Sequence, residues 1–216
     1  PFLIFNACNV NTEAVYTKLH EDIYEINNQY FYGEKVHTYL IELDDKVLLI
    51  DIPTYSAAVK EFILSFNKPP HAIISHGSCG IDDGTKWQSE IGLKVYAHKA
   101  DEHHPWIRMK PDVLFTDMPV FDDTIEVIHT PGHSAGSICV LEKKTKSIFA
   151  GDTFYGTVEG EIRDFTEEKQ ADYENIEDRI ASCKMLLEYD FENVYPFHYE
   201  TVIGNGKQRL HDYMKK

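Results

Sequence analysis

The sequence predicts one α/β domain in which two β-sheets pack together and helices cover their outer faces. Runs typical of strands and runs typical of helices alternate along the chain, and each half opens with strands and ends in a helix followed by a strand. No low-complexity run, long linker or repeat interrupts the 216 residues. From the pattern alone, a generic α/β fold accounts for these features equally well.

Strands dominate the first half. The β-branched and aromatic runs IYEI (23–26), VHTYLIEL (36–43) and VLLID (47–51) predict three strands, with a DDK hairpin turn between the last two. Residues 56–66 predict a helix, because apolar residues recur there at helical spacing before two prolines. HAIIS (71–75) is typical of a buried strand. After a glycine-bounded loop, TKWQSEI predicts a helix and LKVYAH a strand.

The second half begins with a region, 101–119, that shows no periodicity and is interpreted as loop and short elements. Three strands follow, namely TIEVIHT, SICVLE and KSIFAGD. A long amphipathic helix is predicted over about 168–189, with Tyr173, Ile176, Ile180, Cys183 and Leu187 on one stripe, and NVYPF (193–197) is a last short strand. The first sixteen residues predict an early strand rather than a signal peptide, because no basic segment precedes their short apolar run.

Composition limits the classes of partner. The chain carries 36 acidic against 21 basic residues, a formal net charge of -15, which repels nucleic acid and anionic membrane surfaces. No run approaches the roughly 20 apolar residues that a membrane span requires. The four cysteines form no CxxC pair, which favours a reducing, cytoplasmic compartment. A small-molecule substrate is therefore expected.

Three side chains of metal-ligand type follow three predicted strands. In HTPGHSAGS (129–137) a Pro-Gly turn presents His133 at the end of a strand; SIFAGD ends in Asp152, and YPFH ends in His198. Rigid strand ends can direct imidazole and carboxylate groups at one metal ion. The alternative is a polar turn network in which these groups satisfy backbone atoms.

These motifs resemble the metallo-β-lactamase superfamily. HTPGHSAGS, AGDTF and PFH follow a VLLID strand and an IISHG strand in the family's order, over about residues 22–200. The resemblance implies a four-layer αββα sandwich with metal at one edge. It also implies that His133 binds a first metal, that Asp152 bridges two metals, and that His198 binds the second.

One loop departs from the family's pattern. Members carry H-x-H-x-D-H, where this chain has SHGSCGIDDG (75–84). His76 matches the first histidine, but Ser78, Gly80 and Ile81 stand where the other three ligands are expected. The loop therefore lacks three of the family's four ligands.

The remaining ligands favour one metal ion rather than two. His76, His133 and Asp152 remain for the first metal, whereas only Asp152 and His198 remain for the second. Two imidazoles and one carboxylate form a facial triad, which suits Fe(II) and also accepts zinc or manganese. Among family members, persulfide dioxygenases resemble this use of ligands, although they keep the full motif.

The leading hypothesis is a hydrolase. The metal would lower the pKa of a bound water toward about 7 for attack on an ester, thioester, lactam or lactone carbonyl. Asp152 is the first catalytic candidate, and Asp82 or Asp83 could replace the missing loop acid; Cys79 is interpreted as a small filler. A mononuclear iron oxygenase acting on a thiol or persulfide is the first alternative, and a non-catalytic member of the fold is the second.

Other polar and aromatic residues are given ordinary roles. His98, His103 and His104 lack the i, i+4 spacing of helical metal ligands, so a solvated surface is favoured. His129 is interpreted as structural, and Asp51 as an acid that supports a metal ligand or fixes a turn rather than a ligand itself. Tyr155 and Tyr199 follow the ligand-bearing turns and could line a pocket or simply pack.

Overall fold

The computed structural model describes residues 14–77, 83–166, 171 and 173–216. The predicted early strand lies largely outside these residues, since only its last residues are described. The elements are, in chain order, β1 (Tyr16–Lys18), β2 (Ile23–Ile26), β3 (Tyr30–Phe31), β4 (Glu34–Lys35), β5 (Thr38–Glu42), β6 (Val47–Ile50), α1 (Ala57–Ser65), β7 (Pro70–Ile73), α2 (Gly84–Ile91), β8 (Lys94–His98), the 3₁₀ turn η1 (Lys99–Asp101), β9 (Val113–Phe115), β10 (Ile125–His129), β11 (Ile138–Glu142), β12 (Ser147–Gly151), α3 (Ile176–Leu186), β13 (Asn193–Pro196) and α4 (Gly206–Tyr213).

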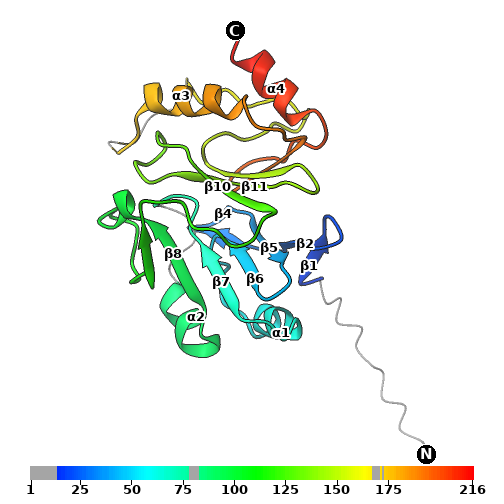
Figure 1. Cartoon of the computed structure of the whole chain (residues 1–216), viewed down its shortest axis with the longest axis vertical. Coiled ribbons are helices and arrows are strands. Elements are labelled where there is room, and N and C mark those ends of the chain that lie inside the picture. The colour runs from blue at the N-terminus through cyan, green and yellow to red at the C-terminus, as the bar shows by residue number, and fades with distance from the viewer. Residues whose placement is uncertain (1–13, 78–82, 167–170, 172) are drawn as a thin grey trace, which may run out of the picture.

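The elements form four layers. In the described residues, one sheet has the strand order β1-β2-β5-β6-β7-β8-β9 and a second has the order β10-β11-β12-β13. Figure 1 shows α1 and α2 below the first sheet and α3 and α4 above the second, with the two sheets facing each other between them. The fold is therefore the predicted αββα sandwich.

Three apolar layers explain why the central strands are buried on both faces. Along β5, Ile41 packs between the two sheets, whereas its neighbour Leu40 faces α1 and α2. The same alternation occurs in β11, where Val140 faces the first sheet and Leu141 faces α3 and α4. Successive side chains of a strand point to opposite faces, so a strand between two apolar layers needs apolar residues at every position.

The predicted core elements are confirmed. Strands β2, β5–β8 and β10–β13 and helices α1 and α2 all fall within or beside the predicted segments. The DDK segment joins the antiparallel strands β5 and β6. Helix α1 begins where Ser56 Oγ accepts a hydrogen bond from the backbone N–H of Val59, 3.1 Å away, as expected of an N-cap serine.

The prediction for the long helix was wrong at its start. Helix α3 begins at Ile176, because the side chain of Asn175 accepts hydrogen bonds from the N–H groups of Glu177 and Asp178 and so caps it there. Tyr173 precedes the helix and belongs to no stripe on it. The sequence also did not predict the β3–β4 hairpin, β9 or α4, all of which are short.

Strand direction brings the predicted site residues to one edge of the sandwich. Strand β10 is antiparallel to β11, β11 is antiparallel to β12, and β12 is parallel to β13, so β10, β12 and β13 all end at the same edge. The first sheet joins this edge through a 2.8 Å hydrogen bond from the N–H of Ile138 to the carbonyl of Ser75, next to His76. Within the described residues, no helix has the length and apolar character that crossing a membrane requires.

Candidate metal centre

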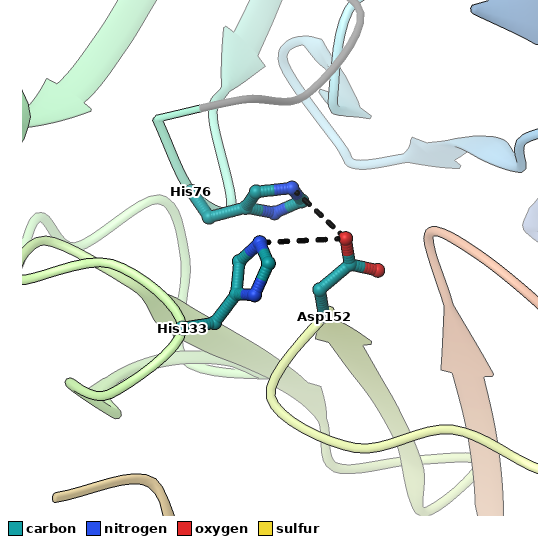
Figure 2. A group of neighbouring side chains, drawn as sticks. All are labelled: His76, His133 and Asp152. Atoms are coloured by element: carbon teal, nitrogen blue, oxygen red, sulfur yellow. Dashed lines mark ion pairs between the residues drawn. The ribbon is translucent and has the colours of Figure 1, made fainter. Parts of the chain in front are cut away.

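His76, His133 and Asp152 converge from three separate strand ends. His76 follows β7, His133 lies in the turn between β10 and β11, and Asp152 follows β12. The Asp152 Oδ2 atom lies 3.3 Å from His76 Nε2 and 3.6 Å from His133 Nε2, and all three ligand atoms lie within 4.8 Å of one another (Figure 2). Two ligands each about 2.05 Å from a tetrahedral zinc ion lie roughly 3.3 Å apart. The spacing of the three atoms thus suits a common cation.

The turn that presents His133 depends on Gly132. This residue has φ +141°, a conformation that side chains rarely adopt, and its N–H donates to the carbonyl of Ser134 at 3.0 Å. Its own carbonyl accepts from the N–H of Asn175 at 2.7 Å. A Cβ at Gly132 would lie 2.3 Å from the backbone of Arg179 in α3. The Pro-Gly pair therefore lets the turn lie directly against α3.

A buried relay fixes the orientation of His76. Both the N–H and the hydroxyl of Ser75 donate to the carboxylate of Asp51, at 2.7 and 2.8 Å. The Ser75 Oγ atom also lies 2.8 Å from His76 Nδ1. Because the hydroxyl proton goes to Asp51, Oγ accepts from Nδ1–H, and neutral His76 then has its lone pair on Nε2. Asp51 thus acts on His76 through Ser75, which is one of the two roles predicted for it.

Glu174 fixes the orientation of His133, as Ser75 does for His76. Its Oε1 atom lies 2.5 Å from His133 Nδ1, and its Oε2 accepts a hydrogen bond from the N–H of Ala171 at 2.7 Å. A carboxylate accepts and does not donate, so Nδ1 carries the proton and the lone pair of neutral His133 is on Nε2. Burial lowers the pKa of His133, against the opposing effect of Glu174, and so favours the neutral ring.

The donor set fits a metal ion. The Nε2 atoms of His76 and His133 and the Oδ2 atom of Asp152 are all acceptors when the histidines are neutral, and acceptors this close repel unless a cation lies among them. Two imidazoles and one carboxylate are ligands for Zn²⁺, Fe²⁺ and Mn²⁺. We therefore regard the group formed by His76, His133 and Asp152 as able to hold one divalent ion.

His198 holds the carboxylate of Asp152. Its backbone N–H donates to Asp152 Oδ1 at 3.2 Å, and its Nδ1 lies 2.8 Å from Oδ2. Burial alone would raise the pKa of Asp152, but the charges of His198 and His76 outweigh it and hold that pKa well below its usual value. Burial lowers the pKa of His198, whereas the charge of Asp152, the hydrogen bond to it and the charges of Glu34 and Asp51 together raise it, so the net shift is upward. The described group of three ligands does not include His198.

The C-terminal turn around His198 is in turn held by the first sheet. The backbone N–H of His37 donates a hydrogen bond to the carbonyl of Phe197 at 2.8 Å. Its side-chain Nε2 donates to the carbonyl of Tyr199 at 2.9 Å. His37 Nδ1 lies 2.6 Å from Glu25 Oε1. Glu25 of β2 and His37, just before β5, therefore help to position a site residue of the C-terminal half.

The other predicted residues lie elsewhere. Asp82 and Cys79 are outside the described residues, and Asp83 is not in the three-ligand group: its Oδ2 accepts a hydrogen bond from the N–H of Tyr55 at 2.7 Å. His103 is exposed, as predicted, but the prediction of a solvated surface was wrong for His98, which is 8% exposed and stacks on His129 with ring centroids 4.3 Å apart.

Sequence reasoning missed Glu174 and His37, and its prediction of a solvated surface was wrong for His104. His104 is half-buried and packs against Gly77, where a Cβ would lie 2.3 Å from its ring. Its ring also lies 4.6 Å from that of Tyr173, which neighbours His133. No local pattern marks these three residues, because each acts through a contact that only the tertiary fold creates.

Comparison with known proteins places these features in context. A model described as "Metallo-beta-lactamase superfamily" matches residues 86–198, which include His133, Asp152 and His198. Acyl-coenzyme A thioesterase MBLAC2 of Homo sapiens is 33% identical over 109 residues, 47% of this chain and 35% of that protein. MBLAC2 of Gallus gallus is 34% identical over 94 residues, 42% of this chain and 30% of that protein. The matches thus span about a third of the length of these curated relatives.

Solved structures share the fold at low sequence identity. The crystal structure of the DIM-1 metallo-beta-lactamase has a TM-score of 0.72 and 16% identity, covering 93% of this chain and 94% of that one. An archaeal metallo-beta-lactamase superfamily protein from Sulfolobus tokodaii has a TM-score of 0.67 and 17% identity, covering 90% of this chain and 85% of that one. At this level of identity the likeness concerns the fold alone.

Proposed function

Because the chain belongs to the metallo-β-lactamase superfamily, we propose that it is a metal-dependent hydrolase of thioesters. The observation that carries the proposal is the convergence of His76 Nε2, His133 Nε2 and Asp152 Oδ2 at one edge of the sandwich. One divalent ion held there would activate a water molecule and polarise a carbonyl. We assign the ion to zinc first, with iron and manganese as alternatives.

The protein's own residues prepare the site for this chemistry. Ser75 and Glu174 keep protons on the Nδ1 atoms of the two histidines and so keep both Nε2 lone pairs directed at the site. His198 orients the Asp152 carboxylate with two donors. Such neighbours hold ligand rings and carboxylates in place before the substrate binds.

The missing loop acid favours a thioester over an amide or lactam. In the reaction, water adds to the carbonyl carbon, the C–S bond breaks, and a carboxylic acid and a thiol are released. A thiol has a pKa of about 8.5, so its sulfur departs as a thiolate and needs little help from a general acid. A site without the acid of H-x-H-x-D-H suits this leaving group. Asp82 remains a candidate base, whereas Asp83 is held by Tyr55.

The curated relatives support the same substrate class. MBLAC2 of Homo sapiens bears the name acyl-coenzyme A thioesterase, and the part it shares with this chain is 33% identical. A small, diffusible thioester also agrees with a chain whose net charge of -15 disfavours nucleic acid. We propose a cytoplasmic location on the cysteine usage alone.

Thiol release from acyl-coenzyme A tests the proposal. Protein purified without chelator should release free thiol, lose this activity on dialysis against chelator, and regain it with zinc. His133→Ala should abolish release, whereas the exposed His103→Ala should not change it. Absence of thiol release with zinc, iron and manganese alike, or full activity of His133→Ala, would overturn the proposal.

A mononuclear iron oxygenase is the second candidate. The described ligand group has two histidines and one carboxylate, the arrangement that non-haem iron oxygenases use. Bound iron together with oxygen uptake in the presence of a persulfide would favour this function. Zinc and oxygen-independent thiol release would favour the hydrolase. Protein that retains no stoichiometric metal would instead indicate a non-catalytic member of the fold.

A further inference from the structure

A cluster of two aromatic rings and one guanidinium lies on the β3–β4 hairpin and the loop after β8; Tyr32 and Arg108 are exposed, and Trp106 is half-buried. The rings of Tyr32 and Trp106 meet edge to face with centroids 5.4 Å apart. The guanidinium carbon of Arg108 lies 5.6 Å from the centroid of Tyr32 and 5.5 Å from that of Trp106. We call Tyr32, Trp106 and Arg108 the rim cluster.

Two contacts connect the rim cluster to the candidate metal centre. On the hairpin, Glu34 Oε2 lies 4.0 Å from His198 Nε2, two residues beyond Tyr32. On the loop, His104 precedes Trp106 by two residues and packs against Gly77, which follows His76. Two residues of chain reach about 7 Å at most. Both segments of the rim cluster therefore border the metal centre.

Turn chemistry does not explain the tyrosine at the tip of the hairpin. Tyr32 and Gly33 are its central residues, with φ values of +49° and +86°. Turns of this kind favour Asn, Asp or Gly at the first position, because other side chains are strained there. Yet Tyr32 places a ring that is 61% exposed at this point. A strained and exposed aromatic residue beside a metal centre indicates a binding role.

The cluster combines two kinds of recognition surface. Aromatic faces and edges suit a planar ring, and a guanidinium suits a phosphate, which it can bind through two parallel hydrogen bonds. Arg108 is one of four basic residues on this hairpin and loop, together with exposed Lys35, Lys99 and Lys110, and exposed Glu34, Glu102 and Asp112 lie on the same segments. A fatty acyl chain would use only the rings, and an anionic peptide thiol would use only the charges.

We propose that the rim cluster binds the nucleotide part of the substrate, with the base against Tyr32 and Trp106 and a phosphate on Arg108. The proposal rests on the proposed thioesterase function and specifies its substrate: a thioester whose thiol carries an adenine nucleotide. The acyl group would then lie at the metal centre while the nucleotide lies at the rim. Binding energy from this remote group would hold the thioester in place for attack.

Titration with coenzyme A and with adenosine 3′,5′-bisphosphate tests the proposal directly. The chain has two tryptophans and Trp87 is fully buried, so quenching of fluorescence reports on Trp106. Both ligands should bind the metal-loaded protein. Tyr32→Ala and Arg108→Gln should each weaken both by on the order of tenfold, as expected for loss of one charge-assisted hydrogen bond or one stacked base.

Two matched variants control for the loss of a ring or a charge. Tyr30→Ala removes a second exposed tyrosine from the same hairpin, and Lys94→Gln removes a cation that lies over the Tyr96 ring at the other end of β8. Both should bind the two ligands as the unchanged protein does. Calorimetric titration should give the same ranking of variants.

Kinetics then separate this proposal from the proposed function. The kcat/KM of Arg108→Gln should fall about tenfold more for acyl-coenzyme A than for the same acyl group on N-acetylcysteamine, which lacks the nucleotide. Nucleotide binding without thiol release would support the rim cluster and refute the hydrolase. Two results would overturn the rim proposal and leave the hydrolase standing. One is hydrolysis of the N-acetylcysteamine thioester by a protein that does not bind the bisphosphate. The other is binding of the bisphosphate that Tyr32→Ala and Arg108→Gln leave unchanged.

Discussion

Replacing Ser75 with alanine removes the hydroxyl that connects Asp51 to His76. Two interactions are lost: the 2.8 Å hydrogen bond to the Asp51 carboxylate and the 2.8 Å contact with His76 Nδ1. A hydrogen bond to a charged group contributes about 1.5–3 kcal/mol, and a buried donor left without an acceptor costs about 1–3 kcal/mol. Asp51 keeps its bond from the Ser75 N–H, so the net loss in the free energy of unfolding should be about 3 kcal/mol.

The same substitution should weaken metal binding. Without the serine oxygen, the Nδ1–H tautomer and the ring orientation of His76 are no longer fixed, and loss of such a neighbour typically costs 10–100-fold in metal affinity, or about 1.4–2.8 kcal/mol. Urea unfolding of the metal-free protein measures the loss of stability, and competition with a zinc chelator measures the loss of metal affinity.

Ser147→Ala is the matched control for Ser75→Ala. Ser147 is equally buried and hydrogen-bonded, but it lies at the start of β12, the end remote from Asp152. It should destabilise the protein without changing metal affinity. If Ser75→Ala bound zinc as tightly as the unchanged protein, the relay would not position His76, and this reasoning would be refuted.

Three further substitutions test other parts of the account. Glu174→Gln should lower zinc affinity at least tenfold in chelator competition, because it weakens the hold on His133 Nδ1. Gly132→Ala should destabilise the protein by about 3 kcal/mol in urea unfolding, because its Cβ would clash with the backbone of Arg179. Burial, and then the nearby His129, lower the pKa of His98, so the folded state binds fewer protons than the unfolded state and loses stability as pH falls below about 6.5. His98→Gln should reduce this loss between pH 7 and 5, measured by thermal unfolding.

Each of these substitutions has a control in the same chain. Glu177→Gln removes an exposed carboxylate from the first turn of α3 and should not change zinc affinity. Gly160 also has positive φ but open space around it, so Gly160→Ala should cost only the backbone strain. His211→Gln should leave the pH dependence as it is, since that ring is exposed. Equal effects of any substitution and its control would contradict the contact assigned to it.

Two features of the sequence predicted the αββα sandwich: the alternation of strand-like and helix-like runs, which a generic α/β fold explains equally well, and the motifs that resemble the metallo-β-lactamase superfamily. The central parts of two such runs, VLLI and ICVL, are apolar at every position, which is the pattern of strands between two apolar layers. The start of α3 was not predictable from its stripe, since Tyr173 continues the apolar spacing although the Asn175 cap begins the helix later. A local cap overrode the periodicity there.

The candidate site was predictable in part, and the reason is topological. His133, Asp152 and His198 follow strands that end at one edge of one sheet, so their positions after strand-like runs indicated a common place. The contacts that orient them come from residues far away in the sequence. Glu174 reaches His133 from the segment before α3, and His37 reaches the His198 turn from the position just before β5. No motif or spacing records such pairs.

Metal content tests most directly whether His76, His133 and Asp152 hold one divalent ion. Elemental analysis of protein purified without chelator should find a single equivalent of zinc, iron or manganese in the unchanged chain and none in His133→Ala. A chain without stoichiometric metal, or a His133→Ala variant that retains the full equivalent, would show that these three residues do not hold the ion.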